Sequence, residues 1–226
     1  MNKFFEKIID IPKTLYFNFY YLPLKKAIKL PFYVSHTIKI KNMGKRDSLS
    51  LDEVKRGIIK IGVSKGSYSL GVRQTGWWNI DSSARVIFKG SANMARGINI
   101  EVSPNAVLEI GNQFFCNANT IISSNKYIKF GDDILIGWNC VFIDGDGHQI
   151  VDLDENLLNA SRKIEIGNHV WFASYSSVLK GSKVPDNTIV AFKANVSGKF
   201  ETGNSILGGN PATEIKNNVN WKHDRI

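Results

Sequence analysis

Residues 130–142 read FGDDILIGWNCVF, and residues 166–196 read IGNHVWFASYSSVLKGSKVPDNTIVAFKANV. In both stretches a bulky aliphatic or aromatic residue recurs at every sixth position: Phe130, Ile136, Phe142, Ile166, Phe172, Val178, Val184, Val190 and Val196. Apolar residues recur every 3.6 positions on one face of a helix and every 2 on one face of a strand. A period of six instead indicates a repeating turn geometry, which is typical of a parallel β-helix built from hexapeptides.

The same pattern predicts where the chain turns and where the repeat begins. Four residues after each bulky position the side chain is mostly compact, which suits a corner around a narrow core: Ile134, Cys140, Val170, Ser176, Ser182, Thr188 and Ala194. A weaker grid of inward positions starts upstream: Ile80, Val86, Ala92, Ile98, Pro104, Ile110, Cys116 and Ile122. Phe130 follows Ile122 by eight positions, so we expect a bulged corner around residues 124–126.

The six-residue grid stops between Phe142 and Ile166, where the chain is polar and acidic. We expect residues 143–163 to leave the prism as a loop, and loops on rigid scaffolds often carry function. This loop contains His148 in the turn DGDGH. The expected organisation is a basic, aromatic N-terminal extension or cap over residues 1–60, a β-helix over residues 61–212 and a C-terminal tail over residues 213–226.

The net charge of +9 is concentrated at the N-terminus. Residues 1–60 carry 13 Lys and Arg against 5 Asp and Glu, whereas the remaining residues are nearly balanced. Phe4, Phe5, Ile8 and Ile9 fit one helical face before Pro12. This segment is expected either to cap the β-helix, as solenoids require, or to lie on an anionic membrane, and the two roles are compatible. No nucleic-acid motif accompanies the basic residues, so nucleic acid is not an expected partner.

Several classes of protein are not expected. Cys116 and Cys140 fall on the grid and should be buried, reduced thiols, because CxxC and clustered His are lacking. Hence we expect no metal. The N-terminus does not resemble a signal peptide, and no run of ~18 apolar residues occurs. The expected location is the cytoplasm, with peripheral contact to the inner face of the cell membrane as an option.

Three segments carry a family resemblance: IKFGDDILIGWNCVFIDGDGHQI, IEIGNHVWFASYSSVLKGSKVPDNTIVAFKANV and ILGGNPATEIK. They resemble the hexapeptide-repeat acyltransferases, above all the sugar-modifying branch with galactoside and maltose acetyltransferases and O-acetyltransferases of capsule and lipopolysaccharide synthesis. The resemblance spans about residues 80–216. It implies an all-β fold, a left-handed parallel β-helix, assembled as a homotrimer, with acetyl-CoA as donor and active sites between neighbouring subunits.

The resemblance also implies roles for single residues. His148 matches the loop His that takes the proton from the acceptor hydroxyl. Trp171 matches a Trp bordering the acceptor and the thioester arm, although it could simply fill a subunit interface. The backbone N–H of Ser174 would stabilise the tetrahedral oxyanion. Asn117 would contact the acceptor, unless it is a polar ladder residue inside the coil.

The remaining candidates are acidic loop residues and coenzyme A contacts. Asp144 and Asp146 stand close to His148 and would contact the acceptor or orient the base. For coenzyme A the family positions are Ser174, Phe192, Ser197, Lys199 and Lys216. Phe192 replaces the small residue usual before the pantetheine tunnel, and the usual Thr-Lys-Asp turn reads Ser197-Gly198-Lys199.

The sequence thus predicts an acetyl-CoA-dependent O-acetyltransferase that modifies a sugar hydroxyl in cell-surface polysaccharide biosynthesis. Two alternatives stay open at this point. One is an N-acyltransferase acting on an amino sugar or nucleotide sugar. The other is a non-catalytic trimeric β-helix scaffold, against which the loop residue His148 argues.

Overall fold

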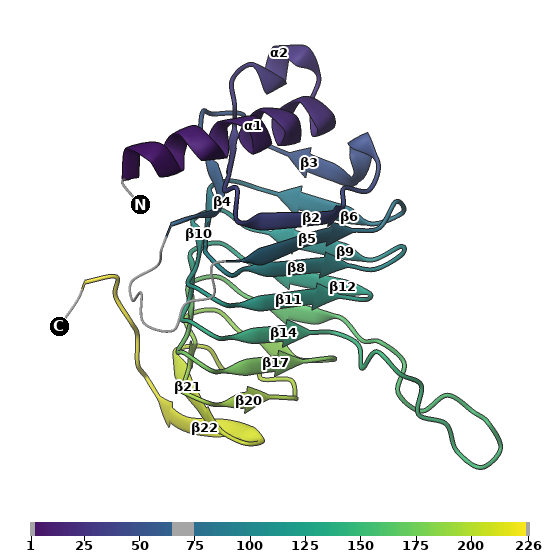
Figure 1. Ribbon diagram of the computed structural model, residues 1–226. Coiled ribbons are helices and arrows are strands. Elements are labelled where there is room, and N and C mark those ends of the chain that lie inside the picture. The colour runs from purple at the N-terminus through teal and green to yellow at the C-terminus, as the bar shows by residue number, and fades with distance from the viewer. Residues whose placement is uncertain (1–2, 65–74, 225–226) are drawn as a thin grey trace.

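The computed structural model describes residues 3–64 and 75–224, with side chains described from Ile8 onward. Its strands wind into a prism with three parallel sheets as faces (Figure 1). Face A contains β1 (Phe32–Val34), β4 (Ile59–Ser64), β7 (Ala92–Ala95), β10 (Phe114–Cys116), β13 (Ile134–Ile136), β16 (Val170–Phe172), β19 (Ile189–Val190), β21 (Ser205–Gly209) and the antiparallel β22 (Ala212–Asn217).

The other two faces follow the same stacking. Face B contains β2 (Ile38–Asn42), β5 (Gly76–Ile80), β8 (Asn99–Val102), β11 (Ile121–Ser124), β14 (Val141–Ile143), β17 (Ser177–Leu179) and β20 (Asn195–Val196). Face C contains β3 (Leu49–Leu51), β6 (Arg85–Phe88), β9 (Val107–Ile110), β12 (Tyr127–Phe130), β15 (Ile164–Ile166) and β18 (Lys183–Val184). Each coil therefore crosses faces A, B and C in turn.

The strict hexad positions form the core. All nine, from Phe130 to Val196, are at most 2% exposed, and the compact corner residues are buried as well, as predicted. Inward phenylalanines pack edge to face along the axis: the ring centroids of Phe130 and Phe142 are 5.0 Å apart, and those of Phe142 and Phe172 also 5.0 Å. Cys116 and Cys140 are free and buried, also as predicted. Burial raises the pKa of the Cys116 thiol to about 12.

The weaker upstream grid is wrong at Pro104, which is exposed at a corner. The reason is coil length. Asn99 pairs with Ile121 in an early coil, and Trp171 pairs with Ile189 in a late coil, so the early coil spends more of the chain on one circuit. Only the shorter, late coil is made of three complete hexapeptides. A six-residue grid therefore loses its register in the wider early coils.

The N-terminal segment caps one end of the prism. Helix α1 (Lys3–Tyr21) lies across that end, followed by the short α2 (Leu24–Ala27), as Figure 1 shows. Phe17 is buried, and its ring centroid lies 5.1 Å from that of Trp78 and 5.2 Å from that of Phe32. Helix α1 extends well beyond the helical face expected before Pro12 and continues through that residue.

The prism begins earlier in the chain than expected. Strand β1 already pairs with β4, so the prism begins at Phe32 and not at residue 61. The short 3-10 helix η1 (Arg46–Ser48) lies between β2 and β3. Within the described ranges, no helix has the length and hydropathy needed to cross a membrane.

The polar loop leaves the prism between Ile143 and Ile164 and projects away from it (Figure 1). Strand β14 nevertheless pairs with β17, with Val141 opposite Ser177, so the coils above and below the loop stack directly. The loop is therefore an addition to an uninterrupted scaffold.

Candidate functional site

The candidate residues lie at two different edges of the prism. The A–B edge comprises the corners where the chain passes from face A to face B, and it carries Asn117, Ser174 and Phe192, with Trp171 beside it on face A. The B–C edge comprises the corners between faces B and C, and it carries Asp144, Asp146, His148, Ser197 and Lys199. Lys216 is exposed on β22. One chain alone does not bring these residues together.

Asn117 follows β10 and is buried in its corner. Its backbone N–H donates to the carbonyl oxygen of Ile136 at 2.9 Å, which ties it to the next coil. Its side-chain Oδ1 accepts from the N–H of Ala118 at 2.9 Å. The side chain is therefore oriented by the corner itself, and the residue serves as a ladder residue whatever else it contacts.

Ser174 occupies the corner after β16 in the same edge, two coils away. Its hydroxyl oxygen accepts from the N–H of Trp138 at 3.2 Å. The backbone N–H of Ser174 donates no hydrogen bond within the described part of the chain. A corner N–H in this state is a donor available to a developing oxyanion.

Gly137 creates the space around Ser174. A Cβ atom built on Gly137 would lie 2.7 Å from both the backbone nitrogen and the hydroxyl oxygen of Ser174. Real Cβ atoms essentially never approach that closely. A side chain at position 137 would therefore push the Ser174 corner outward, so this glycine is a steric requirement of the A–B edge.

His148 sits on the exposed loop, and Asn159 holds its backbone. The Nδ2 atom of Asn159 donates to the carbonyl oxygen of His148 at 2.8 Å and to Oδ2 of Asp146 at 2.8 Å. Among the described residues no hydrogen bond holds the imidazole itself. The loop therefore positions the backbone of His148 and leaves its ring facing solvent in a single chain.

Lys180 ties this loop to the scaffold, a role that the sequence patterns did not reveal. Its ammonium group forms an ion pair with Asp146 and donates to the carbonyl oxygen of Asn159 at 3.0 Å. The hydrogen bonds from Lys180 and Asn159 lower the pKa of the Asp146 carboxyl. Asp146 is therefore an ionised anchor of the loop. The indication of this role available in the sequence was the position of Lys180, which directly follows a strand in the coil after the loop.

Asp144 is buried, and its oxygens accept hydrogen bonds from the bulged corner after β11. The N–H groups of Lys126 and Tyr127 donate to Oδ2 at 3.0 and 2.6 Å, and the N–H of Asn125 donates to Oδ1. Its carboxylate thus serves three backbone donors that would otherwise lack partners. This geometry gives Asp144 a positioning role at the base of the loop rather than an exposed contact to an acceptor.

Trp171 faces a large apolar hollow on face A. The cavity measures about 900 Å³ and is bounded on one side by the returning C-terminal tail. Its lining includes Phe115, Leu135, Trp171, Ile189, Ile206 and Trp221. The two tryptophan rings lie 6.4 Å apart between centroids. The hollow offers an apolar and aromatic wall beside the A–B edge.

The C-terminal tail contacts the prism at Asp133 and His169, which lie at the corners directly before β13 and β16. His169 Nδ1 lies 2.5 Å from Asp133 Oδ2, and its ring stacks on Trp221 with centroids 4.2 Å apart. His223 Nε2 lies 2.7 Å from the other Asp133 oxygen. Partial burial opposes charge on each group, but the mutual hydrogen bonds prevail: they raise the pKa of His169 and lower that of Asp133.

The proposed coenzyme A contacts are accessible but dispersed. Phe192 is exposed, and its ring lies 5.6 Å from that of Tyr175 on the same edge. Ser197 and Lys199 are exposed on the B–C edge, which also carries Lys180. The described residues contain no group of three or more His, Cys, Asp or Glu placed to hold a metal ion.

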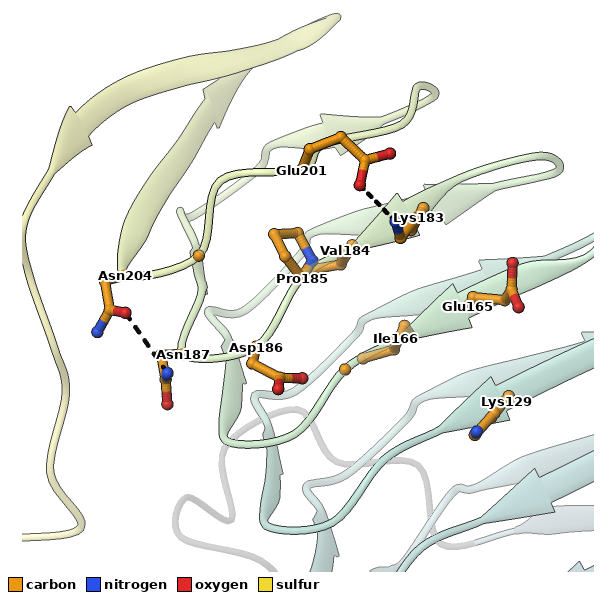
Figure 2. A pocket seen from close by; sticks show the side chains of 12 residues that line it. Lys129, Glu165, Ile166, Lys183, Val184, Pro185, Asp186, Asn187, Glu201 and Asn204 are labelled. Carbon is orange, nitrogen blue, oxygen red and sulfur yellow. Dashed lines mark hydrogen bonds and ion pairs between the residues drawn. The ribbon is translucent and has the colours of Figure 1, made fainter.

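A second hollow lies away from all of these residues. It measures about 490 Å³ and lies beside face C, where Lys183 pairs with Glu201 and Asn187 faces Asn204 (Figure 2). An ion pair between Lys183 and Glu201 lies on its wall, and it contains none of the candidate residues. We therefore place the candidate site on the A–B and B–C edges.

The chain is similar in sequence to known proteins. The chain is 30% identical over 110 residues to the galactoside O-acetyltransferase of Escherichia coli (strain K12), which covers 48% of this chain and 53% of that protein. The chain resembles hexapeptide-repeat acetyltransferases. It is also 23% identical over 144 residues to an uncharacterized 24.8 kDa protein in the cps region of Klebsiella pneumoniae, with 64% of each chain covered. It thus spans between half and two thirds of the length of these relatives.

A solved structure supports the fold. The crystal structure of the polySia specific acetyltransferase NeuO superposes with a TM-score of 0.56 and 19% identity, covering 83% of this chain and 90% of that one. The fold is the left-handed parallel β-helix expected from the sequence. No family model matches the chain.

Proposed function

We propose that this chain is an acetyl-CoA-dependent O-acetyltransferase that modifies a sugar hydroxyl as a homotrimer. The observation that carries the proposal is the division of the candidate site between two edges, with the available N–H of Ser174 on one and His148 on the other. A ring of subunits in which the B–C edge of one faces the A–B edge of the next would complete a site at each interface. The similarity to galactoside O-acetyltransferase supports the chemistry.

The residues divide the reaction between them. His148 would take the proton from the acceptor hydroxyl as its oxygen attacks the thioester carbonyl of acetyl-CoA. The N–H of Ser174 would stabilise the oxyanion, and the coenzyme A thiolate would leave with a proton returned by His148. Trp171 would border the thioester arm beside the apolar hollow, with Asn117 towards the acceptor. Phe192, Ser197, Lys199 and Lys216 are the proposed coenzyme A contacts.

The loop supports a trimer for a separate reason. Its tip presents apolar side chains with little cover from its own chain: Ile150, Val151, Leu153, Leu157 and Leu158. Leu153 is fully exposed. Clusters of exposed large apolar residues commonly mark interaction surfaces. A neighbouring subunit would cover these apolar side chains, and the same contact would bring His148 to the A–B edge of that subunit.

The first test is the His148→Ala variant. Its kcat for thiol release from acetyl-CoA with a sugar acceptor should fall by ~10² or more, with acetyl-CoA affinity nearly unchanged. Galactosides and polysialic acid, on which the relatives are named, are the first acceptors to try. Mass spectrometry of surface glycan from cells with and without the gene would show whether an acetyl group is added to a polysaccharide. Unchanged turnover in the variant would overturn the role of His148.

Subunit complementation tests the divided site. His148→Ala and Asn117→Ala chains, each weakly active, are unfolded, mixed and refolded together. Random mixing places an intact A–B edge against an intact loop at about one site in four, so about a quarter of wild-type activity should return. No recovery, with mixed trimers confirmed by mass, would place the whole site within one chain.

The cellular location follows from the same proposal. An enzyme that uses acetyl-CoA to build a surface polysaccharide would work in the cytoplasm at the inner face of the membrane. We propose peripheral contact with that membrane through the N-terminal segment.

A further inference from the structure

The outer surface of helix α1 is apolar from Ile8 to Phe19, the part of the helix whose exposed side chains the structure describes. Between residues 8 and 19 every exposed side chain is aliphatic, aromatic or proline: Ile8, Ile9, Ile11, Pro12, Leu15, Tyr16 and Phe19. The six of these other than Pro12 are between 40 and 53% exposed. A helix on a protein surface normally turns charged and polar residues to solvent. Here no charged residue is exposed in that span.

The inner surface of the same helix carries the polar residues. Asn18 is buried and exchanges two hydrogen bonds with the backbone of Phe32, at 2.8 and 3.1 Å. Thr14 exchanges two with the backbone of Val34, at 3.2 and 3.0 Å. These side chains complete the open edge of β1, which would otherwise expose unpaired backbone groups. The helix is thus fixed in this orientation by specific bonds.

Two more contacts fix the first turns. Asp10 accepts from the backbone N–H of His36 at 2.6 Å, and Lys13 donates to the carbonyl oxygen of His36 at 2.7 Å. The helix cannot rotate its apolar surface inward without breaking all of these bonds. An apolar surface held outward by a built set of polar contacts indicates a partner that covers it.

Basic residues flank this surface. Lys25, Lys26 and Lys29 are exposed on and after α2, interleaved with exposed Leu24 and Ile28, at the same end of the prism (Figure 1). Asp10, the one acidic residue described between residues 8 and 30, is paired with His36. Apolar side chains flanked by unopposed lysines are complementary to the interface of a bilayer with anionic headgroups.

We propose that the outer surface of α1, with Leu24, Ile28 and the three lysines of the α2 region, binds an anionic lipid bilayer. The apolar side chains would enter the interfacial region, and the lysines would contact headgroup phosphates. In a trimer with parallel subunits three such surfaces would lie at one end and bind together. The inference is independent of the proposed enzymatic function, because it concerns the helix-capped N-terminal end of the prism and uses no site residue.

The test is co-sedimentation of the full chain with vesicles of phosphatidylcholine containing about 30% phosphatidylglycerol, an anionic lipid. The wild-type chain should sediment with these vesicles, and Leu15→Glu and Phe19→Glu should each reduce binding by about tenfold or more. Ile215→Glu, an exposed apolar position on β22, is the matched control and should bind like wild type. Replacing each lysine by Gln should weaken binding about fivefold, and neutral phosphatidylcholine vesicles should bind weakly.

Folding is checked independently, because the substituted side chains are exposed. Circular dichroism and the melting temperature of the Leu15→Glu and Phe19→Glu variants should match wild type. Absence of vesicle binding, or binding that is equal in these variants, would overturn the proposal. A particle mass that halves in Leu15→Glu, without vesicle binding, would instead identify a second copy of the assembly as the occupant and would equally overturn it.

Discussion

The side-chain amide of Asn159 donates to the carbonyl oxygen of His148 at 2.8 Å, and in doing so it joins the two ends of the projecting loop. The same amide nitrogen reaches Asp146, and the amide oxygen accepts from the N–H of Ile150 at 2.7 Å. One side chain thereby sets the backbone path on both sides of His148. The position of the proposed base depends on this amide more than on any carboxylate.

Asn159→Ala should therefore lower kcat by about tenfold, because the loop would hold His148 in several positions instead of one. Affinity for acetyl-CoA and the melting temperature should change little. Asn156→Ala is the matched control, since Asn156 lies in the same loop but its side chain donates to Asp152 and not, among the described residues, to the backbone of His148. Steady-state kinetics of both variants check the prediction, and equal losses would assign the effect to the loop in general.

Gly137→Ala should lower kcat more than Ser174→Ala does. The added methyl group would collide with the backbone nitrogen of Ser174 and move the proposed oxyanion donor, whereas removing the Ser174 hydroxyl leaves that N–H in place. We expect a loss of about 10²-fold for the glycine variant and a few-fold for the serine variant. The reverse order would indicate that the hydroxyl, and not the N–H, contributes to the reaction.

Asp144→Asn should destabilise the fold. An amide offers one acceptor oxygen where three backbone N–H groups now share two, and its NH₂ group would face donors. The expected decrease in the free energy of unfolding is about 2 kcal/mol, measured by urea denaturation. Asp154→Asn, at an exposed loop position, is the control and should be neutral. An unaffected Asp144→Asn chain would show that the corner does not need the carboxylate.

The contact between the C-terminal tail and the prism, which includes His169 and Asp133, should depend on pH. His169 has a pKa raised above its ordinary 6.5, so its contribution to stability is complete below that value and is lost as pH rises through the raised pKa. Asp133 has a pKa lowered below 3.8, so its contribution is complete above 3.8 and is lost only in stronger acid. Between about pH 4 and pH 6.5 both contributions are present.

The melting temperature should therefore fall as pH rises from about 6 to about 8.5, and Asp133→Asn should flatten that dependence. Differential scanning fluorimetry across this range is sufficient. A slope that is unchanged in the variant would mean that groups other than this pair determine it.

Much of the fold follows from one periodicity. Strict hexads such as Phe172 and Val178 point inward because each hexapeptide carries the chain to the next face, so every sixth residue reaches the equivalent inward position. The prediction failed at Pro104 because wider coils insert residues at corners without any marker in composition. Helix α1 continues through Pro12, which is an exposed position of the helix.

The site was predicted less completely. Successive hexads lie on faces A, B and C in turn, so Cys116 falls on face A and Phe142 on face B. This order would have assigned Asn117 and His148 to different edges, so the division of the site was present in the spacing. The contact between His169 and Trp221 was not, because the two residues are far apart in the chain and no period links a tail to a face. An isolated tryptophan in a polar tail was the available signal that the tail packs on the prism.

The length of the projecting loop leaves the pairing of the scaffold strands unchanged. Ser177 pairs with Asn195 on one side and with Val141 on the other, and the stretch of chain back to Val141 is twice as long as the stretch forward to Asn195. The loop thus adds the length of one coil while leaving every neighbouring strand in register. A segment of this kind can be exchanged or redesigned as a module, and the choice of acceptor could change over evolution without any alteration of the core that supports it.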